Sequence, residues 1–595
     1  MRTPSICVFL LLVPAVFSEE VRPVSHQIQF ESNVPVPMRD RVTLYADVYR
    51  PVGSGRYPVL VTRTPYGKQR DGIHQNLIDF ARRGYAVVAQ DVRGRFESEG
   101  SWDPFRYEAK DGYDTVEWAA SQPWSNGKVG MFGGSYLGNV QWQAAVEQPP
   151  SLVAIFPAVA STSLYHNTFY HGGAFKLGLS VGWGVVRNAR RVMYPMTLQT
   201  EKYTPDEWKY ESVLWGLPLR TLDTATIGQT VQHFRDLLEH YSYDQYWQSI
   251  SVEERFEKVK VPAHVHGGWF DLLLGGTLNG YTGMRQQGGS PDARKQTRMT
   301  VGPWGHGPSQ KFGDVDFGPE AIRVLFERNL RWFDHYLKGQ DNGIDREPPV
   351  EIFYMGINRW VHHEDWPVPG TKFTPFYLGS NGRANSARGD GTLDTNESSG
   401  AESDQFLYDP ANPVPTLGGN DCCGAPIPAG PVDQRPLESR HDVLVYTGAL
   451  LERPVAIAGP VKMQLYAATD VPDTDFTVKL VDVHPNGFAM NIAEGILRAR
   501  FRNGLDKPEL VKTDEVNRYE IDMRGTANVF QPGHRIRVDI TSSNFPQYDR
   551  NPNTGDPPGA SDRTQVAHQR ILHSAQYKSH IVLPVVEVPR KRQPR

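Results

Sequence analysis

The sequence predicts an α/β core that is interrupted by a helical insertion and followed by a C-terminal β-sandwich. With 595 residues the chain exceeds what one hydrophobic core normally supports, so several folding units are expected. Val- and Ile-rich runs alternate with helix-like segments in the first half, whereas strand-length runs separated by turn residues fill the second half. Hydrophobic residues (39%) and charged residues (22%) lie near globular averages, which excludes a disordered or fibrous chain.

The α/β core is predicted over residues 19–162 and 257–345. Strands buried on both faces appear as continuous apolar runs, so these runs and the helical segments between them indicate a mostly parallel sheet covered on both sides. The predicted strands are VTLYADVY (42–49), YPVLVTR (57–63), YAVVAQD (85–91), KVGMFG (128–133), LVAIFPA (152–158), VPAHVHG (261–267) and TRMTVGP (297–303).

The alternation stops between residues 163 and 256, a segment rich in Trp, Tyr, His and Leu with apolar positions at helical spacing. We expect a helical cap there, lying over one end of the sheet. From residue 346 to 595 the strand-like runs VEIFYMG, FTPFYLG, VLVYTGALL, VKMQLYAA, DFTVKLVDV, RIRVDITSS and HIVLPVV indicate an antiparallel sandwich of the jelly-roll kind.

Residues 1–18, MRTPSICVFLLLVPAVFS, have the order of a secretory signal peptide: an early arginine, an apolar run too short to span a bilayer, and a small residue at the expected cleavage point. We therefore expect an exported protein, in the periplasm or the medium. The net charge of −4 provides no basic surface for nucleic acid and no polybasic membrane anchor. Neither nucleic-acid binding nor membrane insertion is expected, and the oligomeric state is left open.

Beyond Cys7 in the leader, the chain has only the adjacent Cys422 and Cys423. A disulfide scaffold needs more cysteines, so stability must come from the hydrophobic cores. The pair could form a vicinal disulfide, stay reduced or bond to another chain. We interpret it as a loop feature without a catalytic role.

The stretch VGMFGGSYLG (129–138) places Ser135 on a glycine turn between a predicted strand and a predicted helix. This is the setting of the nucleophile in α/β-hydrolases. The glycine that usually stands two places after the serine is replaced by Leu137, with Gly138 one place later. On this motif alone, a purely structural turn is the alternative.

Asp271 and His306 each follow a predicted strand, in VPAHVHGGWFD and TRMTVGPWGHG. Functional groups of an open α/β sheet gather beyond the carboxyl ends of its strands. The order Ser135, Asp271, His306 is that of the α/β-hydrolase triad, in which an acid orients the base that activates the serine. Taken singly, Asp271 could cap a helix and His306 could be a turn histidine.

Two groups are candidates for stabilising an oxyanion. One is the backbone N–H of Tyr136, directly after the serine. The other is the phenol of Tyr66, just past the strand YPVLVTR, which could instead pack on Pro65.

No metal or cofactor is expected. Zinc needs three or four ligands, and no phosphate loop or dinucleotide fingerprint is present. The acidic segment 97–114 is interpreted as a helix cap and an ion pair with Arg93 or Arg95 rather than as a calcium loop. For zinc, the sequence offers only pairs of histidines as candidate ligands: His166 and His171, His264 and His266, and His362 and His363.

The segments TRTPYGK, AQDVRGRFESEG, GMFGGSYLG, GWFD, VGPWGHG and FYMGINRWVHHEDWP together resemble the cocaine-esterase-like branch of the X-Pro dipeptidyl-peptidase family, from about residue 30 almost to the C-terminus. The resemblance implies an α/β-hydrolase core, an inserted helical cap and a C-terminal jelly roll. It also implies that Tyr66 is the oxyanion tyrosine. Phe169, Trp183 and Leu273 are implied to line the acyl pocket, but Phe169 and Leu273 differ from the residues of the cocaine-cleaving relative, so cocaine itself is not an expected substrate.

The sequence thus predicts an exported serine hydrolase that cleaves small-molecule carboxylic esters through an acyl-enzyme. X-Pro dipeptides and β-lactam or α-amino acyl compounds are alternative substrates, because other members of the family that this sequence resembles act on them. An alternative of another class is an inactive protein that binds carbohydrate or another surface, since jelly rolls also serve that purpose.

Overall fold

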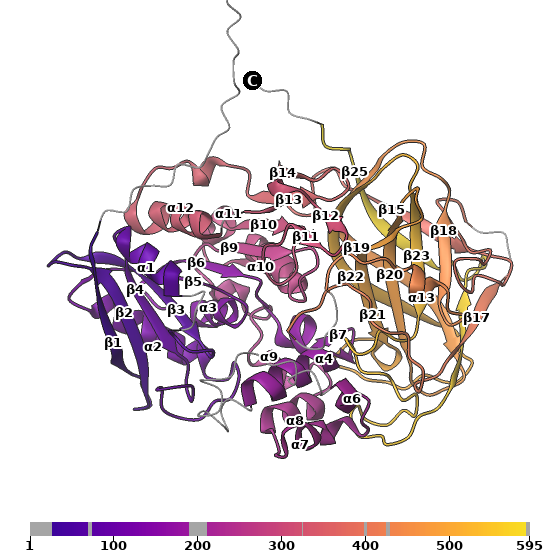
Figure 1. Cartoon of the computed structure of the whole chain (residues 1–595), viewed down its shortest axis with the longest axis horizontal. Helices are drawn as coiled ribbons and strands as arrows, with labels where there is room; N and C mark the ends of the chain where they lie inside the picture. Colours follow the sequence, from indigo (N-terminus) through magenta and orange to yellow (C-terminus); the bar gives the residue numbers. More distant parts are fainter. Residues whose placement is uncertain are drawn as a thin grey trace, which may run out of the picture.

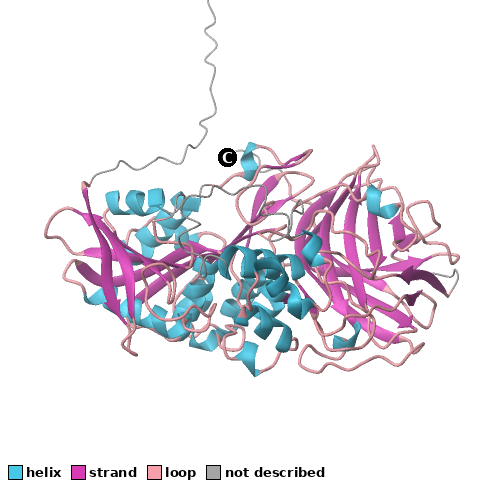
Figure 2. Cartoon of the chain, turned by 60° about the horizontal axis from the view of Figure 1, so that its bottom comes forward, coloured by secondary structure: helices cyan, strands magenta, loops and turns pink. Residues whose placement is uncertain are grey.

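The computed structural model describes residues 26–69, 74–189, 211–323, 325–397, 402–423 and 429–590. A mixed sheet with helices on both faces and an all-β part lie at opposite ends, and a group of helices lies between them (Figures 1 and 2). These correspond to the predicted α/β core, C-terminal β-sandwich and helical cap. The predicted signal peptide, residues 1–18, lies outside the described residues. Within the described ranges, no helix is long and apolar enough to cross a membrane.

Within the described residues, the core sheet has ten strands in the order β1-β2-β4-β3-β5-β6-β9-β10-β13-β14. The seven strands from β4 to β13 pair in parallel, while β1, β2 and β14 are antiparallel at the two edges. The strands are β1 (Ile28–Pro37), β2 (Thr43–Pro51), β3 (Tyr57–Thr64), β4 (Ala86–Asp91), β5 (Ser125–Gly134), β6 (Leu152–Ala158), β9 (His264–Gly268), β10 (Arg298–Gly302), β13 (Val350–Tyr354) and β14 (Arg359–His363).

Helices cover both faces of this sheet because successive side chains of a strand point to opposite sides. On β5, Met131 belongs to the cluster under α2 and α3, whereas Phe132 belongs to the cluster under α1 and α12. In α12, Leu330, Phe333 and Leu337 recur at helical spacing and are buried. The core helices are α1 (His74–Arg82), α2 (Glu108–Ser121), α3 (Tyr136–Val146), α10 (Leu274–Gln287), α11 (Pro291–Gln296) and α12 (Leu325–Lys338).

In its described residues, the cap contains short helices and a small hairpin held around an aromatic cluster that includes Tyr165, Phe234 and Trp247. Figure 1 shows these helices below and between the two sheets. Its described elements are η1 (Tyr165–Phe169), β7 (Tyr170–His171), β8 (Ala174–Phe175), α4 (Leu177–Leu179), η2 (Ser180–Ala189), α6 (Glu211–Leu214), η4 (Leu219–Thr221), α7 (Leu222–Ile227), α8 (Gln232–Glu239), α9 (Gln245–Gln248) and η5 (Phe256–Lys258).

The C-terminal strands form one hydrogen-bonded set in which the long β19 pairs with β22, β24 and β25, and β21 packs against β22. The strands are β15 (Lys372–Gly379), β16 (Thr392–Asp394), β17 (Ser403–Tyr408), β18 (Leu444–Gly448), β19 (Val455–Thr469), β20 (Asp475–Val483), β21 (Ala489–Arg498), β22 (Asn517–Phe530), β23 (Arg535–Thr541), β24 (Ala567–Leu572) and β25 (His580–Val586).

One strand lies in a different sheet from the one predicted. VEIFYMG (350–356) was assigned to the sandwich, but its strand β13 pairs in parallel with β10, Met299 opposite Val350, and so extends the core sheet. A short apolar run has the same appearance in either kind of sheet, so its pattern could not distinguish them. The predicted boundary at residue 346 therefore precedes the last two strands of the core sheet.

Candidate active site

Ser135 lies on a strained turn between β5 and α3, with φ 62° and ψ −126°. A side-chain-bearing residue rarely adopts positive φ, and such strain concentrates at functional sites. Gly133 is required because an added Cβ would lie 2.6 Å from the Cβ of Leu137, and Gly138 because its Cβ would lie 2.6 Å from that of Ala160. Gly138, one place after the usual glycine of the motif, therefore still lets α3 approach the end of β6.

Asp271 and His306 meet beyond the ends of β9 and β10. The Nδ1 of His306 donates to the Oδ1 of Asp271 over 2.8 Å, and Asp271 is fully buried. The two loops interlock through backbone hydrogen bonds from Phe270 to Trp304 (2.8 Å) and from Trp269 to Gly302 (2.9 Å). Gly268 permits this approach, since a Cβ there would lie 2.2 Å from the carbonyl oxygen of Trp304.

The loop that carries Asp271 is also held from the C-terminal domain. The side-chain amide of Asn420 donates to the carbonyls of Trp269 (2.9 Å) and Asp271 (3.0 Å). From the cap, the buried Nζ of Lys176 donates to the carbonyl of Leu272 (3.3 Å). Burial lowers the pKa of Lys176 well below its usual value, with a further decrease from the neighbouring guanidinium of Arg524.

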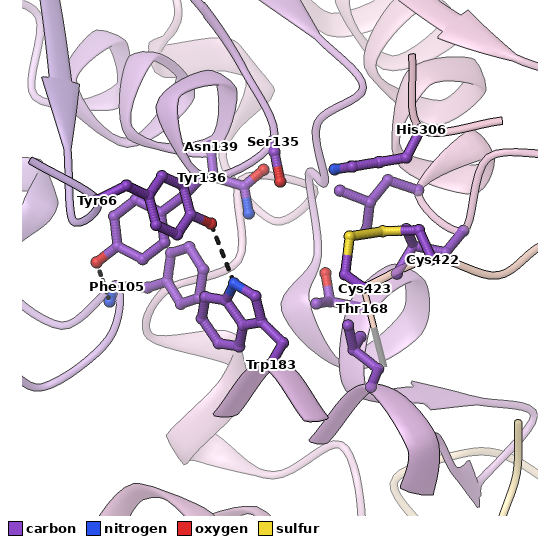
Figure 3. Close-up of a pocket in the computed structure, with 13 residues that line it drawn as sticks. Tyr66, Phe105, Ser135, Tyr136, Asn139, Thr168, Trp183, His306, Cys422 and Cys423 are labelled. Carbon is purple, nitrogen blue, oxygen red and sulfur yellow. Dashed lines mark hydrogen bonds between the residues drawn. A yellow bond between two sulfur atoms is a disulfide. The ribbon is translucent and has the colours of Figure 1, made fainter. Parts of the chain in front are cut away.

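Tyr66 faces the turn of Ser135 from the end of β3. Its hydroxyl oxygen accepts a hydrogen bond from the indole Nε1 of Trp183 (3.0 Å), a residue of the cap helix η2 (Figure 3). A phenol oxygen can accept one hydrogen bond and donate another. The backbone N–H of Tyr136 begins α3, where the first N–H groups have no partner within the helix.

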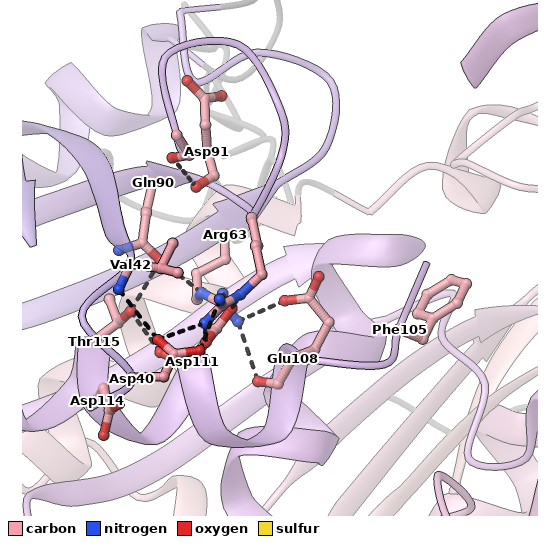
Figure 4. A network of polar contacts seen from close by, with 12 residues as sticks. Asp40, Val42, Arg63, Gln90, Asp91, Phe105, Glu108, Asp111, Asp114 and Thr115 are labelled. Atoms are coloured by element: carbon pink, nitrogen blue, oxygen red, sulfur yellow. Dashed lines mark hydrogen bonds and ion pairs between the residues drawn. The ribbon is translucent and has the colours of Figure 1, made fainter. Parts of the chain in front are cut away.

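A buried polar network fixes the side chain of Tyr136. The phenol of Tyr136 donates to Oε1 of Glu108 (2.7 Å), and Oε2 of Glu108 accepts from Nη1 of Arg63 (2.7 Å). Figure 4 shows Arg63 between Gln90, which accepts from its Nε (2.7 Å), and Glu108. Burial raises the pKa of Glu108, while the cation of Arg63 opposes that increase. Burial also raises the pKa of Tyr136, so the phenol stays protonated and can donate.

Ser135 and His306 line one pocket, and Figure 3 shows the imidazole of His306 directed toward Ser135. The cavity measures about 30 Å³. Its described lining is mainly aromatic and aliphatic: Tyr66, Phe105, Ser135, Tyr136, Asn139, Thr168, Leu179, Trp183, Leu272, Leu273, His306, Cys422 and Cys423.

Two family models match the chain. That of the X-Pro dipeptidyl-peptidase (S15 family) covers residues 40–308, and that of the X-Pro dipeptidyl-peptidase C-terminal non-catalytic domain covers residues 342–582. Cocaine esterase of Rhodococcus sp. (strain MB1 Bresler) is 40% identical over 578 residues, which cover 93% of this chain and 98% of that enzyme. The chain belongs to the S15 X-Pro dipeptidyl-peptidase family.

Solved structures agree with this membership. An aminopeptidase from a marine sediment archaeon, Thaumarchaeota archaeon, superposes with a TM-score of 0.81 at 26% identity, over 97% of this chain and 100% of that one. An α-amino acid ester hydrolase superposes with a TM-score of 0.79, also at 26% identity and with the same coverage. The chain is therefore a serine hydrolase of the cocaine-esterase-like branch of the S15 family.

The structure places two of the three predicted pocket residues of this S15 hydrolase at the cavity. Trp183 and Leu273 line it, but Phe169 does not. The ring of Phe169 packs behind Trp183, with centroids 6.2 Å apart, and against Trp247, at 6.0 Å. An aromatic residue on a cap helix can face either the pocket or the interior of the cap, and the sequence alone did not distinguish these two faces.

Cys422 and Cys423 form a vicinal disulfide that lines the pocket, a position that the sequence analysis missed. They pack on Leu179, Leu272 and Leu273. Because the pair lies far from the triad in sequence and on the C-terminal domain, no spacing signal linked it to the site. Phe105, Thr168 and Asn139 were also missed: Phe105 and Thr168 come from other segments, and Asn139 lies one helical turn after Ser135 on α3, where no motif marks it.

The histidine pairs have separate partners. His264 interacts with Thr300 (3.1 Å), His171 with Tyr548 (3.1 Å) and His166 with Glu253 (3.5 Å). The interpretation of the acidic segment as part of an ion pair is confirmed, because Asp111 accepts from Nη2 (2.6 Å) and Nε (2.9 Å) of Arg93.

Proposed function

We propose that this protein is an exported carboxylic ester hydrolase that forms an acyl-enzyme on Ser135. The observation that carries the proposal is the 2.8 Å hydrogen bond from His306 to the buried Asp271, made by a histidine that shares an apolar pocket with the strained Ser135. A serine is nucleophilic only beside such an oriented base.

In the proposed mechanism Asp271 holds the Nδ1–H of His306, which leaves Nε2 to take the proton of Ser135. The serine oxygen attacks the ester carbonyl and forms a tetrahedral oxyanion. The N–H of Tyr136 and the phenol of Tyr66 donate to this oxyanion. The C–O bond to the alcohol then breaks as His306 returns the proton, and water releases the acid by the same steps.

Tyr66 is suited to the role of a preorganised donor. Its oxygen already accepts from Trp183, so its orientation is set before substrate arrives. A donor that needs no reorganisation stabilises a developing charge more strongly than water does. Loss of one such donor typically lowers kcat by about 100- to 1000-fold, the decrease expected for Tyr66→Phe.

Esters with small, uncharged acyl groups fit the site best. The lining combines aromatic rings, leucines and a disulfide around a cavity of about 30 Å³. The names cocaine esterase and α-amino acid ester hydrolase, carried by two similar proteins, support ester cleavage as the chemistry. We propose short-chain aryl and alkyl esters, with acetyl esters cleaved faster than benzoyl esters.

The nucleophile is tested by Ser135→Ala with a fluorophosphonate probe. The wild-type protein should be labelled once per chain, and the variant should lose both labelling and ester turnover. Ser121→Ala, at an exposed serine that ends α2, is the matched control and should retain both. Undiminished labelling of Ser135→Ala would overturn the assignment.

The substrate class is tested with a panel of chromogenic esters, X-Pro anilides and β-lactams. We expect kcat/KM to be at least 100-fold higher for acetyl esters than for X-Pro anilides. The opposite ranking would make the protein a dipeptidyl-peptidase. Absence of turnover and of fluorophosphonate labelling would favour the surface-binding alternative.

Export is tested by expressing the full chain in a bacterial host. The protein recovered outside the cytoplasm should begin at Glu19. Recovery of a chain that still begins at Met1, from the cytoplasm alone, would contradict this part of the proposal.

A further inference from the structure

The vicinal disulfide occupies a wall of the pocket close to the imidazole of His306. Figure 3 shows the sulfur–sulfur bond of Cys422 and Cys423 beside His306, on the side of the cavity away from Tyr66. The two Sγ atoms and one ring nitrogen of His306 all lie within 4.8 Å of one another. Two sulfurs and an imidazole therefore converge on one small space, although the three residues come from two loops more than 100 positions apart.

This geometry approaches that of a zinc site. From Zn–S bonds of about 2.3 Å and Zn–N bonds of about 2.0–2.1 Å, tetrahedral ligands lie about 3.6–3.8 Å apart. The three ligand atoms lie within 4.8 Å of one another, so rotation of the side chains can bring them to these separations once the two sulfurs are no longer bonded to each other. Three protein ligands with the fourth position open to water form a known class of zinc site.

His306 is also oriented as a metal ligand would be. Its Nδ1 donates to Asp271, which leaves Nε2 for the pocket. A carboxylate that holds the second ring nitrogen is the usual partner of a metal-binding histidine, because it fixes the ring and increases its basicity. The Asp271–His306 pair can therefore serve either a serine or a metal ion.

We propose that Cys422 and Cys423 form a redox-controlled metal site that switches the pocket between two states. In the oxidised state the disulfide is an apolar wall. A dithiol or phosphine reductant supplies two electrons, and two protons from solvent complete the two thiols. A thiophilic divalent ion such as Zn²⁺ or Cd²⁺ then binds both sulfurs and Nε2 of His306, and the two thiol protons return to solvent. Thiolate ligands select these ions over Mg²⁺ or Ca²⁺.

Metal binding and ester hydrolysis exclude each other in this arrangement. The nitrogen that binds the ion is the one that takes the proton of Ser135 in the proposed mechanism, so the ion removes the base. The inhibition therefore rests on the proposed function, whereas the metal site itself does not. The oxidising surroundings expected after export keep the disulfide closed and the enzyme active.

Binding is measured by cadmium titration, because cadmium–thiolate bonds absorb in the ultraviolet. The protein carries Cys7→Ser, which leaves Cys422 and Cys423 as its only cysteines. After reduction with a phosphine and removal of the reductant without air, we expect one Cd²⁺ per chain and the thiolate absorption. Without reduction we expect no such absorption and no reaction with an alkylating reagent after denaturation.

Variants identify the ligands. Cys423→Ser should lower the affinity of the reduced protein for Cd²⁺ at least 100-fold. His306→Gln should lower it at least tenfold while retaining the thiolate absorption. Ser135→Ala should bind Cd²⁺ as tightly as the parent, because the serine is not a ligand. Equal affinity in His306→Gln, or equal binding before and after reduction, would overturn the proposal.

Activity provides the second readout. Stoichiometric Cd²⁺ should abolish ester hydrolysis by the reduced protein, leave the oxidised protein unaffected, and be reversed by a chelator. If the reduced protein binds Cd²⁺ but neither the reduced nor the oxidised protein hydrolyses an ester, the proposed function fails and the metal site stands. If it hydrolyses esters and Cd²⁺ binds without inhibiting, His306 is not a ligand and the site proposed here is wrong.

Discussion

The two halves of the pocket are held in place by different parts of the chain. Ser135 and Tyr136 are supported from within the core, where the network of Arg63 and Glu108 fixes the side chain of Tyr136. The loop of Asp271 is supported from outside the core, by Asn420 of the C-terminal domain and by Lys176 of the cap. The nucleophile half is therefore held in place by the core alone, whereas the acid–base half is held in place by contacts among the core, the cap and the C-terminal domain.

This difference predicts different consequences of mutation. A mutation in the network inside the core leaves a buried charge without its partner and lowers the stability of the whole domain. Damage to the contacts between domains leaves each domain folded but shifts Asp271 relative to Ser135. A displacement of about 1 Å can lower a rate by about 100-fold. Stability should thus report on the nucleophile half and turnover on the acid–base half.

The largest effect is expected from Arg63→Met. Arg63 is fully buried, and its ion pair with Glu108 has a carboxylate only 3% exposed. Removal of one partner of such a pair typically costs about 3–5 kcal/mol, because the remaining charge is uncompensated. Urea unfolding, monitored by tryptophan fluorescence, should show this decrease in the free energy of unfolding.

The matched control for that prediction is the double variant Arg63→Met with Glu108→Gln. It removes the stranded charge and should recover most of the lost stability, since neighbouring changes of this kind are not additive. A single variant as stable as the wild type would show that the core does not depend on this network.

The three triad residues, all carried by the core, were easier to predict than the parts that reach the pocket from the other domains. Ser135 is marked by a local pattern of strand, glycines and helix, and Asp271 and His306 each follow an apolar run, in the chain order of the α/β-hydrolase triad. The parts supplied from a distance were not predicted. Asn420 and the disulfide of Cys422 and Cys423 reach the pocket through domain packing, which no local pattern encodes.

The same limit explains the strand at 350–356. Its residues predicted a strand correctly, but whether it would pair with β10 or with the sandwich depends on long-range packing. Phe169 shows the limit at the scale of one side chain, since the orientation of its helix decides whether it faces the pocket or Trp247.

The second prediction concerns the cap at acid pH. His233 of α8 is partly buried and donates from Nε2 to the carbonyl of Gly184 (3.1 Å), next to Trp183. Burial lowers the pKa of His233 to about 4. The unfolded chain binds the proton near pH 6.5, so the stability contributed by the neutral imidazole is complete above pH 6.5 and is lost as the pH falls toward 4. The loss is at most about 3 kcal/mol.

His233→Gln keeps a donor near the same position and does not titrate. The free energy of unfolding of the variant, measured from pH 7 to pH 4, should therefore decrease less steeply than that of the wild type. Parallel curves for the two proteins would mean that His233 is not the group responsible.

A third, smaller effect is expected from Asn420→Ala, which breaks the contact between the C-terminal domain and the acid loop. Two buried carbonyls lose their donor, which costs about 1–3 kcal/mol, and kcat should fall about 10- to 100-fold as Asp271 shifts. Asn486→Ala, in an exposed turn of the same domain, is the control and should leave kcat unchanged. A large loss of stability with normal kcat would assign Asn420 to folding alone.

The smallest effect is expected from Trp183→Phe, which keeps an aromatic ring in the pocket but removes the N–H that orients Tyr66. A hydrogen bond worth about 1 kcal/mol corresponds to a decrease in kcat of about fivefold. Because Trp183 acts through Tyr66, the double variant with Tyr66→Phe should lose no more kcat than Tyr66→Phe alone. Additive losses would show that Trp183 contributes through its own contact with substrate, and the cap would then take part in the acyl pocket independently of the core.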